Sequence, residues 1–171
     1  RSRMAQAALA NALALTVKAD RDIVVGLGVD NGFNHLLVQP EINSIAYIKG
    51  KTMVVDAVNT AFAFQLYEML RQRGLQKGDY TVKSEGGSKA RLDAMIKDKS
   101  MVAAMMSPPF LALGLKAGLK DMGTAAAALG AYQGSSIYVL RSGAKANSDT
   151  MVKSCQDTSK GQRWAHTPQT K

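Results

Sequence analysis

The sequence predicts an α/β fold in which a parallel-rich sheet is flanked by helices. Short apolar runs, typical of covered strands, alternate with longer segments whose apolar residues recur at helical spacing. Glycine, asparagine or proline stands between these segments, where turns are expected. Alternation of strands and helices is typical of a parallel sheet covered by helices.

The length and composition of the chain limit its possible fold and location. It has 171 residues, of which 46% are hydrophobic, enough for one domain or two small lobes. No run of about 18 apolar residues occurs, so no membrane span is expected. Cys155 is the only cysteine, which rules out an internal disulfide. No signal peptide is visible, because Asn11, Lys18 and Asp20 interrupt the first Ala- and Leu-rich stretch.

The net charge of +9 suggests a nucleic-acid partner, but the distribution of charge argues against one. Six Lys or Arg and two Asp fall within residues 141–171, so much of the excess lies in the C-terminal segment. The other basic residues are mixed with acidic ones on predicted helix faces. We therefore expect no nucleic-acid partner.

The N-terminal part predicts a helix, a strand and a flexible turn. The Ala- and Leu-rich residues 4–18 predict the helix, and residues 22–27 predict a buried strand. Residues 28–32 are rich in Gly, Asp and Asn, which tolerate left-handed backbone. The apolar residues 33–38 end before Pro40, and their pattern leaves strand and helix open.

Residues 51–64 predict a strand, a turn and the first turns of a helix. Val54 and Val55 are β-branched and apolar, as a covered strand requires. Asn59 or Thr60 can cap the helix, because a short side-chain oxygen accepts from its unpaired N–H groups. A loop with free N–H groups at the carboxyl end of a strand suits a small ligand, above all an anion.

The rest of the chain either repeats this strand–turn–helix arrangement or closes around it. Strands are predicted at residues 52–55, 80–83, 101–106 and 136–140. Helices are predicted at residues 60–73, 89–99 and 110–117, and a terminal helix begins at residues 147–154. The intervening residues 119–129 are apolar but rich in Ala and Gly. From residue 156 the sequence is polar and unpatterned, which predicts a poorly ordered tail.

Three loops follow three of these strands, at residues 56–60, 85–88 and 107–110. In an open α/β sheet such loops meet at one edge, where ligands bind. Each loop alone has the Gly and Pro residues of an ordinary turn, but three such loops in succession favour a pocket. Arg91, one turn into the helix after the second loop, either reaches an anion as a bidentate donor or is a solvated charge.

The residues that commonly hold metals or perform catalysis are scattered. His35, His166 and Cys155 are far apart in sequence, so no metal site and no cofactor is expected. Asp30 and Asp56 are loop carboxylates suited to acid–base chemistry, although capping and turn hydrogen bonds are their commoner use.

Four motifs follow one another along the chain: KGKTMVVDAVNTAFAFQLYEMLRQRGL, DYTVKSEGGSKARLDAMIKDK, AAMMSPPF and LGAYQGSSIYVLR. In order and spacing they resemble the substrate-binding proteins of ABC transporters, in the branch related to nitrate, sulfonate and thiamine-pyrimidine-precursor binding proteins. The upstream DNGFNHLLVQPEINSIAYIKGKT fits the same family. The resemblance covers residues 22–154.

The resemblance implies a type 2 periplasmic-binding fold, in which two α/β lobes close on a small ligand at a hinge. It implies a partial first lobe with a hinge segment at residues 1–43 and a complete second lobe at 44–131. A return hinge strand and terminal helix follow at 132–155, and a basic tail at 156–171. The first lobe is expected to be partial, because the family has further strand–helix units before the segment equivalent to residues 4–18.

The resemblance also implies a function, the binding of an anionic or polar organic solute in an interlobe cleft by loop polar groups and helix N-termini. The implied ligand positions are Asn31, Gly32, Asp56, Asn59, Thr60, Gly87, Ser107, Pro108, Tyr132 and Gln133. It further implies a periplasmic or secreted location, with an ABC-transporter permease as partner.

Two alternatives remain open at this point. One is an enzyme on the same scaffold, which transforms a small organic molecule by positioning it in the cleft. Its candidate catalytic residues are Asp56, Tyr132, Asp30 and His35. Fungal pyrimidine-precursor synthases of the same superfamily carry a cysteine-rich iron-binding motif that this chain lacks. The other alternative is a structural remnant whose exposed cleft surface is covered by self-association, which would give a homo-oligomer.

Overall fold

The computed structural model describes residues 4–167 and divides into two compact units. The second unit is one uninterrupted segment, Gly32–Tyr132. The first unit contains the described residues up to Asn31 and those from Gln133 onward, so the chain passes between the units twice. The second unit begins earlier than the predicted lobe at 44–131, because strand β3 (His35–Val38) belongs to its sheet.

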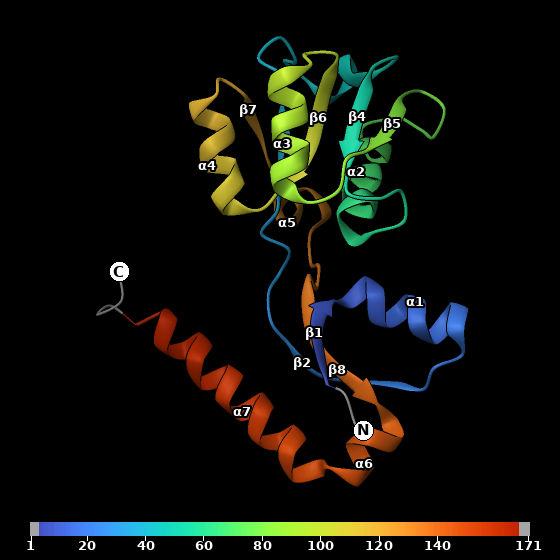
Figure 1. Cartoon of the computed structure of the whole chain (residues 1–171), viewed down its shortest axis with the longest axis vertical. Helices are drawn as coiled ribbons and strands as arrows, with labels where there is room; N and C mark the ends of the chain where they lie inside the picture. Colours follow the sequence, from blue (N-terminus) through green and yellow to red (C-terminus); the bar gives the residue numbers. More distant parts are fainter. Residues whose placement is uncertain (1–3, 168–171) are drawn as a thin grey trace. The chain divides into compact units, whose positions relative to one another are not determined.

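A five-stranded mixed sheet in the order β5-β4-β6-β3-β7 forms the centre of the second unit (Figure 1). Besides β3, its strands are β4 (Thr52–Val55), β5 (Thr81–Ser84), β6 (Met101–Met106) and β7 (Lys120–Thr124). β4 pairs in parallel with β5 and β6, whereas β3 pairs antiparallel with β6 and β7. The predicted α/β fold class is confirmed, with parallel pairing confined to β5, β4 and β6.

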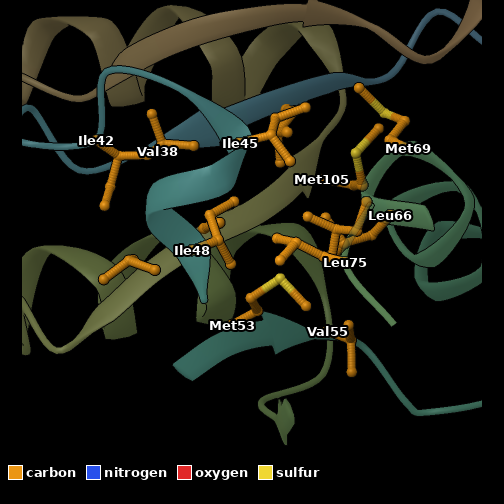
Figure 2. Close-up of a cluster of buried hydrophobic side chains, with 14 of the residues drawn as sticks. Val38, Ile42, Ile45, Ile48, Met53, Val55, Leu66, Met69, Leu75 and Met105 are labelled. Carbon is orange, nitrogen blue, oxygen red and sulfur yellow. The ribbon is translucent and has the colours of Figure 1, made fainter. Parts of the chain in front are cut away.

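Helices cover both faces of this sheet. They are the 3-10 helix η1 (Ile45–Ile48), α2 (Ala61–Arg71), α3 (Ser88–Lys97), α4 (Pro108–Lys116) and α5 (Ala125–Leu129). Successive strand residues point to opposite faces. Met53 and Val55 therefore pack with side chains of η1, α2 and α5, a cluster that Figure 2 shows in part. Val54, between them, packs with Leu92 and Met95 of α3 on the other face.

The predicted apolar stripe of α2 is confirmed in its buried part. Leu66, Met69 and Leu70 lie at the spacing of a helix face and are at most 2% exposed. The strands predicted at 52–55 and 101–106 coincide with β4 and β6, whose continuous apolar residues are covered on both faces. The core of the second unit follows directly from these patterns.

β7 and α5 are the elements of the second unit that the sequence did not resolve. Residues 119–129 were expected only to be apolar, but Lys120–Thr124 forms an edge strand beside β3. The strand contains Lys, Asp and Gly, so its own pattern predicts little. Its hydrogen bonds to β3, a long-range partner, determine its structure.

The first unit contains a three-stranded antiparallel sheet with β8 in the centre, in the order β1-β8-β2. Its elements are β1 (Ala5–Ala8), α1 (Leu9–Ala19), β2 (Ile23–Gly28), β8 (Ser135–Leu140), α6 (Arg141–Ala146) and α7 (Ser148–Ala165). The prediction of a helix from residue 4 was wrong for β1. Ala favours helices, but pairing with β8 overrides this local preference.

Helix α7 continues through Ala165, so the tail predicted from residue 156 is helical up to that residue. Residues 168–171 lie outside the described residues. α7 contains no buried residue, and a helix that is polar all round lacks an apolar period. Contacts with β2 and with the residue that follows it hold α7 in place: a Cβ on Gly26 would meet Met151 Cε, and Gln162 Nε2 donates to Val29 O at 2.6 Å. No helix within residues 4–167 is long and apolar enough to cross a bilayer.

Candidate ligand-binding site

The candidate site lies at the edge of the second unit's sheet where β4, β5 and β6 end. These strands are parallel and in close register, with Val55 opposite Ser84 and Val54 opposite Ala104. Their carboxyl ends, and the three predicted loops that follow them, therefore meet at one edge.

Two further chain segments reach the same edge. β3 and β7 are antiparallel to each other, and His35 at the start of β3 pairs with both Met106 and Thr124. The segment before β3 and the beginning of α5 therefore lie beside the three loops. The backbone N–H of Ala125 donates to Asn34 O at 2.8 Å, which joins these two segments.

The loop between β4 and α2 contains Asp56, Asn59 and Thr60. Thr60 is the N-cap of α2, and its Oγ1 accepts from Ala63 N at 3.3 Å. The Thr60 hydroxyl also donates to the Asp56 carboxylate. The sequence left the cap open between two residues, and the structure places Thr60 there and leaves Asn59 exposed.

The loop between β5 and α3 presents open backbone at two glycines. Gly86 has φ +79°, which favours glycine, and its N–H donates to Asp56 O at 3.2 Å. Gly87 is the N-cap of α3 and supplies no side-chain cap. A Cβ added to either glycine would meet no atom within 4 Å. The first turn of α3 is therefore open to an external acceptor.

The loop between β6 and α4 has a similar helix start. Ser107 is the N-cap of α4, but its side chain makes no cap hydrogen bond, and Pro108 is the first helical residue. The N–H groups of Phe110 and Leu111 both donate to Ser107 O at 3.0 Å. Ser107 is half-buried and Pro108 is exposed. A second helix without a side-chain cap thus begins at this edge.

Arg91, in the first half of α3, is 1% exposed. Its Nη1 donates to Gly86 O at 2.7 Å, and its Nη2 donates to Ser88 Oγ at 3.0 Å and to Met105 O at 3.1 Å. Its guanidinium carbon lies 4.9 Å from the centre of the Phe62 ring. Arg91 is therefore not a solvated charge, and both of its terminal nitrogens donate to the protein.

Tyr132 belongs to a chain of hydrogen bonds that the sequence did not suggest. Gln65 Nε2 donates to Tyr132 OH at 3.3 Å, and Asn34 Nδ2 donates to Gln65 Oε1 at 2.9 Å. Gly32 has φ +76°, and a Cβ there would lie 2.6 Å from Tyr132 Cδ1. One signal existed, because Gln65 lies four residues before Met69 and so interrupts the buried stripe of α2.

Asn31 and Gln133, two predicted ligand residues, belong to the first unit, as does Asp30. Gln133 Nε2 donates to Asp30 O at 2.6 Å and to Ser135 O at 2.7 Å, so both of its donor hydrogens are used within the first unit. Asn31 is exposed. The side chain of Gln133 packs against Gly28, because a Cβ added to Gly28 would lie 2.3 Å from Gln133 Oε1.

Two candidate catalytic residues of the enzyme alternative, His35 and Asp56, contact other side chains rather than each other. His35 Nδ1 lies 2.8 Å from Asp121 Oδ2, whereas the partner of Asp56 is Thr60. The negative charge of Asp56 and, above all, burial raise the pKa of Tyr67. Within residues 4–167, no group of three His, Cys, Asp or Glu side chains is placed to hold a metal ion.

The fold is similar to that of solved periplasmic binding proteins. The structure is similar to the periplasmic aliphatic sulphonate binding protein SsuA from Escherichia coli, with a TM-score of 0.77, 18% identity, and coverage of 95% of this chain and 55% of the other. It is similar to the alkanesulfonate-binding protein SsuA from Xanthomonas axonopodis pv. citri bound to MOPS, with a TM-score of 0.71, 21% identity, and coverage of 91% and 53%.

The same architecture occurs in an enzyme. The desulfurization enzyme DSZB has a TM-score of 0.58 and 11% identity, with coverage of 92% of this chain and 60% of the other. No family model matches the chain, and no curated protein sequence matches it. The predicted resemblance to the sulfonate-type binding fold is confirmed at the level of structure, and the chain spans about half the length of the two sulfonate-binding structures.

Proposed function

We propose that this chain is a solute-binding protein that holds a small organic anion at the strand-end edge of its second unit. One observation carries the proposal: α3, which begins at this edge, has no side-chain cap, and its first turn is open at Gly86 and Gly87. The start of a helix carries unpaired N–H donors and about half a positive charge. The start of α3 therefore favours a ligand with acceptor oxygens and negative charge. The start of α4 adds its dipole and the Ser107 hydroxyl, because Pro108 and Pro109 have no N–H and Phe110 N donates to Ser107 O.

The polar groups around these helix starts agree with this role. Asn59 is exposed, and Ser107 does not cap its own helix, so both side chains have capacity for a ligand. The Tyr132 hydroxyl, held by Gln65, adds a donor or acceptor. Asp56 is engaged by Thr60, so we assign the Asp56 carboxylate to loop structure rather than to ligand contact.

A sulfonate is the ligand class we propose. Its three oxygens accept several hydrogen bonds at once, which matches the open first turn of α3 together with the Asn59 and Ser107 side chains. Two proteins of the same fold are described as sulfonate-binding, and one was found with the sulfonate MOPS. By the same analogy, we propose a location outside the cytoplasm and delivery of the solute to an ABC-transporter permease.

A thermal-shift panel tests the proposal. Butanesulfonate and MOPS represent the class, butyrate keeps the charge on a planar head group, and butanol is the uncharged control. A ligand that binds only the folded state stabilises it by about 2.7 kcal/mol at one hundred times its Kd. We expect butanesulfonate or MOPS to raise the melting temperature, with butanol inactive. No shift with any anion at millimolar concentration, or an equal shift with butanol, would contradict the proposal.

The second candidate function is an enzyme acting on the same class of molecule, and the structural similarity to a desulfurization enzyme favours it. Its test is release of inorganic sulfite or sulfate from the sulfonate panel. Activity of the wild type that falls in Asp56→Asn and Tyr132→Phe supports it. Release no faster than in a buffer blank eliminates it.

A further inference from the structure

We propose that Arg91 is a positioning residue for the ligand site, because its guanidinium fixes the three strand-end loops relative to one another. The inference rests on the proposed function, since it assigns Arg91 a role toward the same site. Arg91 does not touch the ligand in this account. It acts through the loops whose backbone and side chains do.

The contacts of Arg91 reach all three strand–helix junctions. In the junction between β5 and α3, Arg91 bonds Gly86 O at 2.7 Å and Ser88 Oγ at 3.0 Å. At the end of β6 it bonds Met105 O at 3.1 Å, two residues before Ser107. In the junction between β4 and α2 it stacks on Phe62, in the first turn of α2.

The electrostatic setting of Arg91 is unusual for a buried charge. Among residues 4–167, the ion pairs do not include Arg91, and its buried Nε has no hydrogen-bond partner. Burial lowers the pKa of Arg91, while the negative charge of Asp56 acts in the opposite direction. A buried unpaired cation is costly, so its contribution lies in geometry more than in ion pairing.

The geometry required is specific to arginine. A guanidinium is planar and carries five N–H donors in a fixed fork, so it can hold several acceptors at set angles. A lysine ammonium keeps the charge but is a single point on a flexible stem. Arg91→Lys therefore separates positioning from charge, and Arg91→Met removes both while leaving an apolar side chain of similar length.

The test measures the Kd for butanesulfonate and the free energy of unfolding on the same set of variants. The set is Arg91→Lys, Arg91→Met, Ser88→Ala and Met95→Ala. Met95→Ala is the matched control, because Met95 is buried in the same helix, and Gln39 Nε2 donates to both Met95 O and Met101 O at the other end of β6. Ser88→Ala removes a single partner of Arg91 and is the mildest change to the loops.

We expect both Arg91 variants to bind roughly tenfold to hundredfold more weakly, by analogy with residues that orient the ligands of metal sites. Ser88→Ala should show a smaller loss. Met95→Ala should lose stability and keep its affinity. Wild-type affinity in Arg91→Lys would overturn the proposal, because charge alone would then suffice. Affinity that simply follows stability across the set would also overturn it.

A ligand-free measurement separates this proposal from the proposed function. In Arg91→Lys, hydrogen exchange should accelerate in residues 56–60, 85–90 and 107–111, and stay unchanged in 35–38 and 120–124. If wild type fails to bind butanesulfonate, the sulfonate proposal fails, and the exchange pattern alone decides the role of Arg91. Exchange that is unchanged, or accelerated uniformly over the second unit, would show that Arg91 does not position the loops.

Discussion

The phenol oxygen of Tyr132 accepts a hydrogen bond from the side-chain amide of Gln65 at 3.3 Å. The other end of Gln65 accepts from Asn34 at 2.9 Å, and Gln65 is only 4% exposed. One buried amide of α2 thus joins the segment before β3 to the last residue of the second unit. Both points where the chain leaves this unit are tied to the helix that begins at the candidate site.

Gln65→Leu should destabilise the protein by about 1–3 kcal/mol, because it removes both hydrogen bonds and leaves Asn34 and Tyr132 without this partner. Urea unfolding measures the change. Gln72→Leu is the matched control, since Gln72 is exposed at the end of the same helix and its loss should stay within about 0.5 kcal/mol. Equal effects of the two substitutions would show that the Gln65 hydrogen bonds add nothing.

Thr60 and Asn59, adjacent in sequence, should respond in opposite ways. Thr60→Ala should cost about 0.5–2 kcal/mol of stability, because it removes the N-cap of α2, whereas Thr60→Ser should retain most of it.

Asn59→Ala should leave the free energy of unfolding within about 0.5 kcal/mol, because Asn59 is exposed, while weakening butanesulfonate binding. Unfolding and calorimetric titration of both variants check this contrast. Unchanged stability in Thr60→Ala would show that Thr60 does not stabilise α2 as a cap. Unchanged affinity in Asn59→Ala would show that Asn59 does not contact the ligand.

The sequence predicted the parts of the fold in which local pattern and tertiary structure agree. Strands β4 and β6 are continuous apolar runs, and α2 has a clear apolar stripe with a capping residue before it. β1 and β7 were missed because their residues have weak or opposed preferences and their structure depends on pairing with distant strands. Long-range pairing of this kind leaves no local signal.

Gly114→Ala should destabilise the protein by about 1–3 kcal/mol. The added Cβ would lie 2.1 Å from Leu37 Cδ2, where α4 packs on β3, so the core must shift. Gly161→Ala is the matched control in α7, where a Cβ meets no atom within 4 Å, and should stabilise by about 0.5–1 kcal/mol. Thermal unfolding compares them. A neutral Gly114→Ala would mean that α4 is not packed this closely on β3.

The sequence predicted which loops meet at one edge of the sheet better than it predicted the side-chain contacts there. The three loops followed from the strand–helix alternation, since parallel strands end at one edge. Arg91 was misread as an exposed charge or a ligand donor, although its place four residues before Met95 puts it on the buried face of α3. The partners of Arg91 and Gln65 come from other elements, so a single sequence does not contain them.

Asp98, which follows α3, should stabilise the folded protein at neutral pH and lose this contribution in strong acid. Its carboxylate accepts from Ser100 Oγ at 2.7 Å and Ser100 N at 2.9 Å, and these bonds hold its pKa below the ordinary value of 3.8. A carboxyl whose folded pKa is lowered stabilises the protein above its unfolded pKa, and this is lost as pH falls through the folded pKa.

The pKa of Asp98 can be followed by NMR titration. Ser100→Ala should raise it toward 3.8, because the hydroxyl donor is lost. The stability difference between wild type and Asp98→Asn should shrink as pH falls below that value. A titration at or above 3.8 in the wild type would show that the two hydrogen bonds do not persist in solution.

The central claim is that an organic anion binds where α3 and α4 begin. Titration of butanesulfonate into isotopically labelled protein, followed by amide NMR shifts, tests it most directly. We expect saturable shifts concentrated in residues 56–60, 86–90 and 107–111, which weaken in Asn59→Ala. Shifts that do not saturate, or that concentrate on α6 and α7 of the first unit, would contradict it.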